Sequence, residues 1–79
     1  MQVKVQYYAL MREQAGRSAE TLQTAAVAAG ELYRDLQARY GFTLAPEQLK
    51  VAINGEFANW AQPLADGDTV VFIPPVAGG

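Results

Sequence analysis

The sequence predicts an α+β fold in which a mixed five-stranded sheet carries one main helix packed on one face. Five short segments have the alternating or β-branched pattern of strands, and one segment between the second and third has the 3.6-residue periodicity of a helix. A helix in that position can join two parallel strands through a right-handed crossover. With 79 residues and no cysteine, the chain is expected to form one small domain without disulfide bonds.

The N-terminal third predicts two strands separated by a short turn of helix. Residues 2–8 alternate between apolar and polar, so Tyr7 is expected to face the main helix and Tyr8 the opposite side. Residues 9–16, ALMREQAG, are good helix formers that end in glycine. Residues 18–24, SAETLQT, are expected to form an edge strand that pairs with the first strand.

The main helix is expected to begin near Ala29 and to end at Gly41, a residue suited to a C-terminal cap. No Ser, Thr, Asp or Asn stands directly before it, and Gly30 weakens its first turn. One apolar stripe at helical spacing is expected to face the sheet: Ala29, Leu32, Tyr33, Leu36 and Tyr40.

The C-terminal third predicts a hairpin and a final buried strand. Asn54-Gly55 between VAI and EFANW is a strong hairpin signal, because both residues tolerate positive φ. ADGD at 65–68 is interpreted as a solvated turn rather than an acidic site. TVVFI at 69–73 is a strand that two prolines end. This order of elements predicts a β-grasp domain over residues 1–74 and a flexible tail over 75–79.

The composition excludes several classes of function. Without cysteine or histidine, the chain lacks the usual ligands of zinc, iron–sulfur and copper sites and the usual nucleophile–base pairs. A net charge of −2 argues against nucleic acid as the main ligand, and no apolar run approaches the ~20 residues that span a bilayer. We expect a cytoplasmic protein that binds no cofactor and is not catalytic by itself.

The last residues, FIPPVAGG, combine stiff and flexible elements. Pro74 and Pro75 favour an extended chain, whereas Gly78 and Gly79 carry no side chains and can enter a narrow slot. Fraying would explain flexibility alone, but not a rigid spacer before a slim tip. We therefore predict that the tail enters a partner's active site with the Gly79 carboxylate as the reacting group. A carboxylate needs activation, usually by ATP, and the chain has no nucleotide-binding loop, so the activating enzyme must be another protein.

Three stretches, YYALMREQAG, VAINGEF and PLADGDTVVFIPPVAGG, resemble the ubiquitin-like sulfur carriers of prokaryotes, in particular the MoaD family of small subunits of molybdopterin synthase. The resemblance covers essentially the whole chain. It implies that a MoeB-like enzyme uses ATP to adenylate Gly79, and that sulfur then replaces AMP to give a thiocarboxylate. It also implies docking onto a MoaE-like large subunit, where the sulfur enters the dithiolene of molybdopterin.

The resemblance also implies which residues contact the partner: Tyr8, Arg12, Pro74, Pro75, Val76, Ala77 and Gly78. Strand alternation adds Val71 and Ile73, which with Tyr8 are expected to form an apolar patch on the open sheet face. The residues leave three alternatives open. These are a sulfur carrier for thiamine thiazole synthesis or tRNA thiolation, a ubiquitin-like modifier that forms isopeptide bonds, and a β-grasp interaction module with an unmodified tail.

Overall fold

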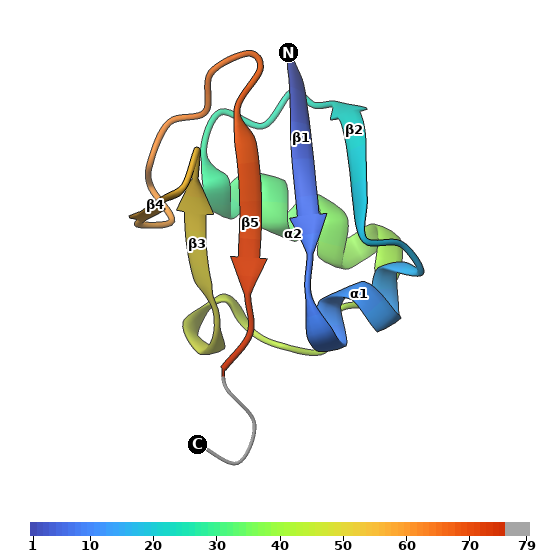
Figure 1. Ribbon diagram of the computed structural model, residues 1–79. Coiled ribbons are helices and arrows are strands. Elements are labelled where there is room, and N and C mark those ends of the chain that lie inside the picture. The colour runs from blue at the N-terminus through green and yellow to red at the C-terminus, as the bar shows by residue number, and fades with distance from the viewer. Residues whose placement is uncertain (76–79) are drawn as a thin grey trace.

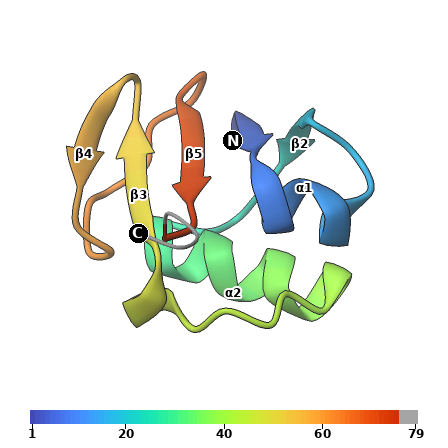
Figure 2. The same cartoon turned by 60° about the horizontal axis from the view of Figure 1, so that its bottom comes forward.

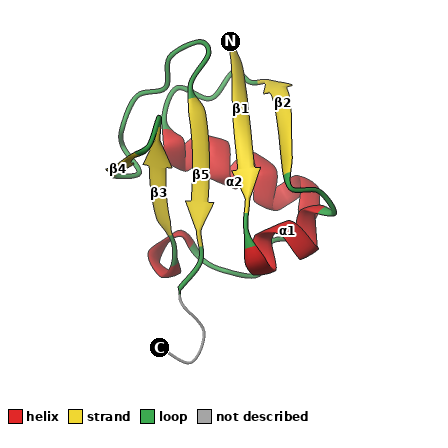
Figure 3. Cartoon of the chain, in the orientation of Figure 1, coloured by secondary structure: helices red, strands yellow, loops and turns green. Residues whose placement is uncertain are grey.

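The computed structural model describes residues 1–75 of the chain and confirms the predicted α+β architecture, with a five-stranded mixed sheet and the main helix on one face (Figure 1). Figure 3 separates the strand layer from the helix behind it. The strands are β1 (Gln2–Tyr7), β2 (Ala19–Gln23), β3 (Lys50–Ile53), β4 (Glu56–Ala58) and β5 (Thr69–Ile73). The helices are α1 (Ala9–Ala15), α2 (Ala29–Tyr40) and the short 3₁₀ turn η1 (Pro46–Gln48).

The first and last strands of the chain lie side by side in the middle of the sheet, whose order is β2-β1-β5-β3-β4. β1 and β5 are parallel, with Val5 opposite Val70 and Tyr7 opposite Phe72, while the other neighbouring pairs are antiparallel. The central strand β5 is therefore hydrogen-bonded on both sides. The residues that follow it leave the domain from a point that two neighbouring strands hold in place.

The core fills the space between the sheet and α2, which crosses one face of the sheet (Figure 2). Tyr7, Val70 and Phe72 are at most 1% exposed, as the predicted alternation requires. On α2, four residues of the predicted stripe are buried: Ala29, Leu32, Tyr33 and Leu36. The Tyr33 ring lies 5.1 Å from that of Phe72, and its hydroxyl donates to a backbone carbonyl at 2.7 Å, so this buried tyrosine keeps a polar partner.

The N-terminus of α2 is capped by tertiary contacts instead of a side chain. The amide of Ala29 donates to the Gln62 carbonyl at 3.2 Å, and the amide of Gly30 donates to the Trp60 carbonyl at 2.9 Å. A Cβ on Gly30 would lie 3.2 Å from the same Trp60 carbonyl oxygen. Gly30 therefore permits a close approach of two backbones that satisfies amides which a helix N-terminus leaves unpaired.

The turns of the C-terminal third form as predicted. Asn54 and Gly55 both have positive φ, 53° and 85°, and join β3 to β4. β4 is shorter than the predicted segment 56–60 and ends at Ala58. In the ADGD turn, Asp66 accepts the amide of Gln2 at 2.7 Å, and Asp68 accepts the amide of Ala65 at 2.8 Å. Both carboxylates thus accept backbone amides at this turn.

Within residues 1–75, no helix is long and apolar enough to cross a membrane.

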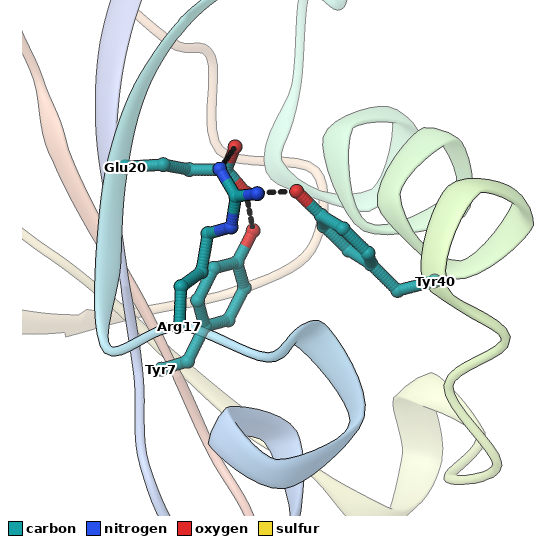
Figure 4. A network of polar contacts seen from close by, with 4 residues as sticks. All are labelled: Tyr7, Arg17, Glu20 and Tyr40. Carbon is teal, nitrogen blue, oxygen red and sulfur yellow. Dashed lines mark hydrogen bonds and ion pairs between the residues drawn. The ribbon is translucent and has the colours of Figure 1, made fainter.

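The partly buried carboxylate of Glu20 links β2 to β1 and α2 (Figure 4). The hydroxyls of Tyr7 on β1 and Tyr40 on α2 each donate to Glu20 on β2 at 2.6 Å, and Arg17 pairs with Glu20 at 3.4 Å. The pattern of apolar residues placed Tyr40 in the core stripe, but it is only partly buried because its hydroxyl reaches this carboxylate. The network connects the C-terminal end of α2 to the edge of the sheet.

Burial raises the pKa of Glu20, but the hydrogen bonds from Tyr40 and Tyr7 and the charge of Arg17 together outweigh burial, so the pKa lies below its ordinary value. Burial and the hydrogen bond to Glu20 raise the pKa of Tyr7. Because its pKa is lower in the folded chain, the ionised Glu20 carboxylate stabilises the fold, and this stabilisation is complete at pH values above the unfolded pKa of about 4.3. That stabilisation is lost as the pH falls from there through the folded value.

We expect Glu20→Gln to reduce the free energy of unfolding at pH 7 by about 1–2 kcal/mol, because charged hydrogen bonds are replaced by neutral ones. The difference from the wild type should shrink as the pH falls below about 4.3. Urea unfolding followed by circular dichroism measures both effects. Glu13→Gln, a change at an exposed carboxylate on α1, is the matched control. A difference that stays constant with pH would contradict this account of Glu20.

Candidate functional site

The tail begins at a fixed position on the end of the central strand. β5 ends at Ile73, which lies opposite Lys50 of β3, and the preceding Phe72 lies opposite Tyr7 of β1. Pro74 is half-buried and Pro75 is exposed, and α1 lies at the same end of the sheet (Figure 1). The predicted partner-contacting residues 76–78 and the reacting residue Gly79 lie outside the described residues.

The face of the sheet opposite α2 is open, and strand register decides which side chains share it. Residues directly opposite one another project to the same face. Phe57 lies opposite Ala52, Ala52 opposite Val71, and Val71 opposite Gln6, so these four form one row across the sheet. The next row toward the tail contains Ile73 and Lys50, its partner on β3.

The predicted open-face patch lies where alternation placed it. Tyr8 directly follows the buried Tyr7 with extended backbone angles and is 50% exposed, while Val71 and Ile73 are partly exposed. Val71 and Ile73 therefore face outward as the alternation predicts, and Tyr8 is exposed. Arg12 is exposed on α1, at the sheet end from which the tail leaves. The contact of these residues with a partner stays a prediction.

Phe57 belongs to the same surface and was not identified from the sequence. It is the most exposed large apolar residue among those described, at 74%. Its face follows from the two-residue turn at Asn54-Gly55, which sets Phe57 opposite Ala52. The sequence does show an aromatic residue shortly after the Asn-Gly turn. The face on which it lies depends on how β3 pairs with β5, which the sequence pattern does not reveal.

A groove of about 360 Å³ lies at the base of the tail and is lined mainly by apolar groups. Phe57 borders it on one side, and Ile73, Pro74 and Pro75 border it at the end of β5. The ammonium group of Lys50 also borders the groove and lies 5.7 Å from the centre of the Phe57 ring. The exposed aromatic side chain, the groove and the first residues of the tail form one continuous surface.

This surface is suited to recognition more than to catalysis. Within residues 1–75, no three acidic side chains come close enough to hold a metal ion. The surface is mainly apolar, although Glu47, Gln48 and Lys50 also line its groove. Contiguous exposed apolar groups mark protein interaction sites. The fold and the site together define a ubiquitin-like β-grasp protein with an exposed apolar surface beside the base of its tail.

Comparison with known proteins identifies the family. The model of the ThiS family matches residues 5–79, which is nearly the whole chain. The chain is 32% identical over 80 residues to the molybdopterin synthase sulfur carrier subunit of Escherichia coli (strain K12), covering 98% of this chain and 99% of that protein. The chain therefore belongs to the ThiS family. The resemblance to ubiquitin-like sulfur carriers of the MoaD type, predicted from sequence, is confirmed.

Solved structures agree with this assignment. A putative molybdopterin converting factor subunit 1 from Pyrococcus furiosus is 28% identical with a TM-score of 0.81, covering 96% of this chain and 99% of that one. A chain in the complex of subunits 1 and 2 of the molybdopterin-converting factor from Helicobacter pylori is 28% identical with a TM-score of 0.69, covering all of both chains. The small archaeal modifier protein 1 from Methanosarcina acetivorans is 25% identical with a TM-score of 0.80, covering 99% of this chain and 96% of that one.

We expect the exposed residues of this surface to contribute little to stability. Tyr8→Thr and Phe57→Thr should each change the free energy of unfolding by less than about 1 kcal/mol, because neither ring is packed in the core. Phe72→Ala, which empties a core position, should cost about 3–5 kcal/mol. Chemical denaturation of the three variants tests this. A loss for Phe57→Thr as large as that for Phe72→Ala would show that Phe57 is a core residue.

Proposed function

We propose that this chain is the sulfur carrier subunit of a molybdopterin synthase. The observation that carries the proposal is its match over 98% of its length to the E. coli molybdopterin synthase sulfur carrier subunit. Support also comes from the geometry, because the tail begins on the central strand next to an exposed apolar surface. In this proposal the domain provides recognition and Gly79 provides the reacting group.

The proposed chemistry takes place in partner enzymes. A MoeB-like enzyme binds ATP, and the Gly79 carboxylate attacks its α-phosphate, releasing pyrophosphate and forming an acyl adenylate. A sulfur nucleophile then displaces AMP and leaves a thiocarboxylate on Gly79. The ionised sulfur of that group attacks a carbon of the pterin precursor and displaces a leaving group there, inside a large subunit that shields the intermediate from bulk solvent. Hydrolysis of the acyl–sulfur bond then leaves the sulfur on the pterin and restores the Gly79 carboxylate. The chain itself binds no cofactor in this scheme, and a cytoplasmic location is part of the proposal.

The open face and the tail have separate parts in the proposal. Tyr8, Val71, Ile73 and Phe57 contact a MoaE-like large subunit, with Arg12 at the edge of the contact. Pro74, Pro75, Val76, Ala77 and Gly78 form the segment that enters the active site. Residues 75–79 span about 15 Å when extended at ~3.1 Å per residue, which is enough to bring the terminus into a deep site. The solved complex of subunits 1 and 2 from H. pylori, one chain of which resembles this chain, supports a partner of this kind.

A second candidate function is protein modification. The similarity to the small archaeal modifier protein 1 from M. acetivorans supports it, because that relative has the same fold at 25% identity. Both functions require an activated Gly79 and differ in the acceptor of the acyl group. A carrier passes the acyl group to sulfur, whereas a modifier passes it to a lysine amine. Sulfur carriers of other pathways would share every step except the final acceptor.

The mass of the intact chain distinguishes these functions. Co-expression with the activating enzyme and a sulfur donor should raise the mass by about 16 Da, because one oxygen atom is exchanged for sulfur at Gly79. Deletion of Gly79 should abolish the increase and leave the melting temperature unchanged, because a terminal glycine has no side chain to pack and chain ends usually contribute little to stability. A ladder of protein conjugates without any 16 Da species would favour the modifier function and contradict the carrier proposal.

Partner binding tests the surface separately from the chemistry. Phe57→Thr and Tyr8→Thr should each weaken binding to the large synthase subunit of the same organism about tenfold or more, as expected for exposed aromatic anchors. Val27→Thr, at an exposed apolar position just before α2, the helix that covers the opposite face, is the matched control and should bind like the wild type. Isothermal titration calorimetry measures the affinities. Unchanged binding by both aromatic variants would place the interface elsewhere.

A further inference from the structure

Both lysines of the chain lie on the open face of the sheet. Lys4 on β1 is opposite Thr69, and Lys50 on β3 is opposite Ile73. Both side chains are exposed. Val71 stands between Thr69 and Ile73 on β5. The two lysines therefore flank the Val71 row, Lys4 on the Thr69 side and Lys50 on the Ile73 side, each about 6.8 Å away along the strands.

The same face carries no carboxylate on its strands, although the chain has eight acidic residues and a net charge of −2. Only two acidic residues are on strands, and by register both lie on the face of the sheet that carries the core. Glu20 is opposite the buried Val5, and Glu56 is opposite Ile53, which packs against the core. The other six acidic residues lie on helices or in loops. The strands therefore carry their lysines on the open face and their carboxylates on the other face, while Glu47 of η1 lines the groove beside Lys50.

Neither lysine is in an ion pair within residues 1–75, where Arg17 and Glu20 form the one pair. Lys50 instead places its ammonium over the exposed ring of Phe57. Such a contact at an exposed site is weak, so it can be exchanged for a carboxylate without a large loss. The aliphatic stem of a lysine can also stay on an apolar surface while its charge turns toward a new partner.

From this arrangement we propose that Lys4 and Lys50 determine which partner the open face accepts, by pairing with carboxylates that flank an apolar surface on the partner. The inference rests on the proposed function and names the chemistry of the partner's docking site: an apolar centre with acidic residues on two opposite sides. Charges at the rim of an interface act mainly on the association rate and on its dependence on salt. They also exclude partners whose rim is basic, because like charges would then meet.

Charge reversal tests this inference. Lys4→Glu, Lys50→Glu and the double variant are compared with Arg34→Glu, which makes the same change in net charge at an exposed position on α2, the helix that covers the opposite face. Association rates with the large synthase subunit are measured by surface plasmon resonance at about 50 and 300 mM NaCl. Circular dichroism verifies that each variant is folded.

At low salt we expect each lysine variant to associate at least about threefold more slowly than the wild type, and the double variant about tenfold more slowly. The differences should largely disappear at high salt, and Arg34→Glu should behave like the wild type. Equal rates for the lysine variants and the wild type, while Phe57→Thr still weakens binding, would overturn this inference alone. A uniform effect of all charge reversals, Arg34→Glu included, would also overturn it. Failure of the wild type to bind would overturn the proposed function and this inference with it.

Discussion

The parallel pairing of β1 with β5 is the interaction on which the rest of the structure depends. It brings the first and last strands of the chain together in the centre of the sheet. The connection through α2 therefore runs from β2 to β3, past both central strands. It sets Tyr7 against Phe72 in the core, and it sets Gln6 against Val71 on the open face. Because β3 holds the other side of β5, the tail leaves a strand that cannot shift without breaking two ladders.

The two faces of the sheet are stabilised differently because they have different neighbours. The face under α2 is a packed aromatic and aliphatic core, fixed at one end of α2 by backbone carbonyls and at the other by Glu20. On the open face Phe57 and Tyr8 are largely exposed. The isolated domain therefore lacks the stabilisation that burial of these rings would provide. An exposed apolar surface of this kind is useful only if a partner covers it.

The chemistry of a sulfur carrier explains why a domain without histidine or cysteine can suffice. Activation, sulfur transfer and attack on the substrate all take place in partner enzymes under the proposed function. The domain must then be recognised by more than one enzyme and must hold the base of its tail at a constant distance from the recognised face. A small, rigid sheet with the tail on its central strand meets both needs, and it would serve a modifier equally well, which is why the fold alone does not decide between them.

The sequence by itself determined the class of fold, the strand alternation around Tyr7 and Tyr8, the Asn54-Gly55 turn and the motif of the tail, because periodicity, turn chemistry and terminal residues are local properties. It did not predict the capping of α2 by Trp60, the hydrogen bonds to Glu20, or the place of Phe57 on the open face. Those features depend on segments far apart in the chain. Only the tertiary structure decided them, because strand register and the packing of α2 determine which distant atoms come within contact.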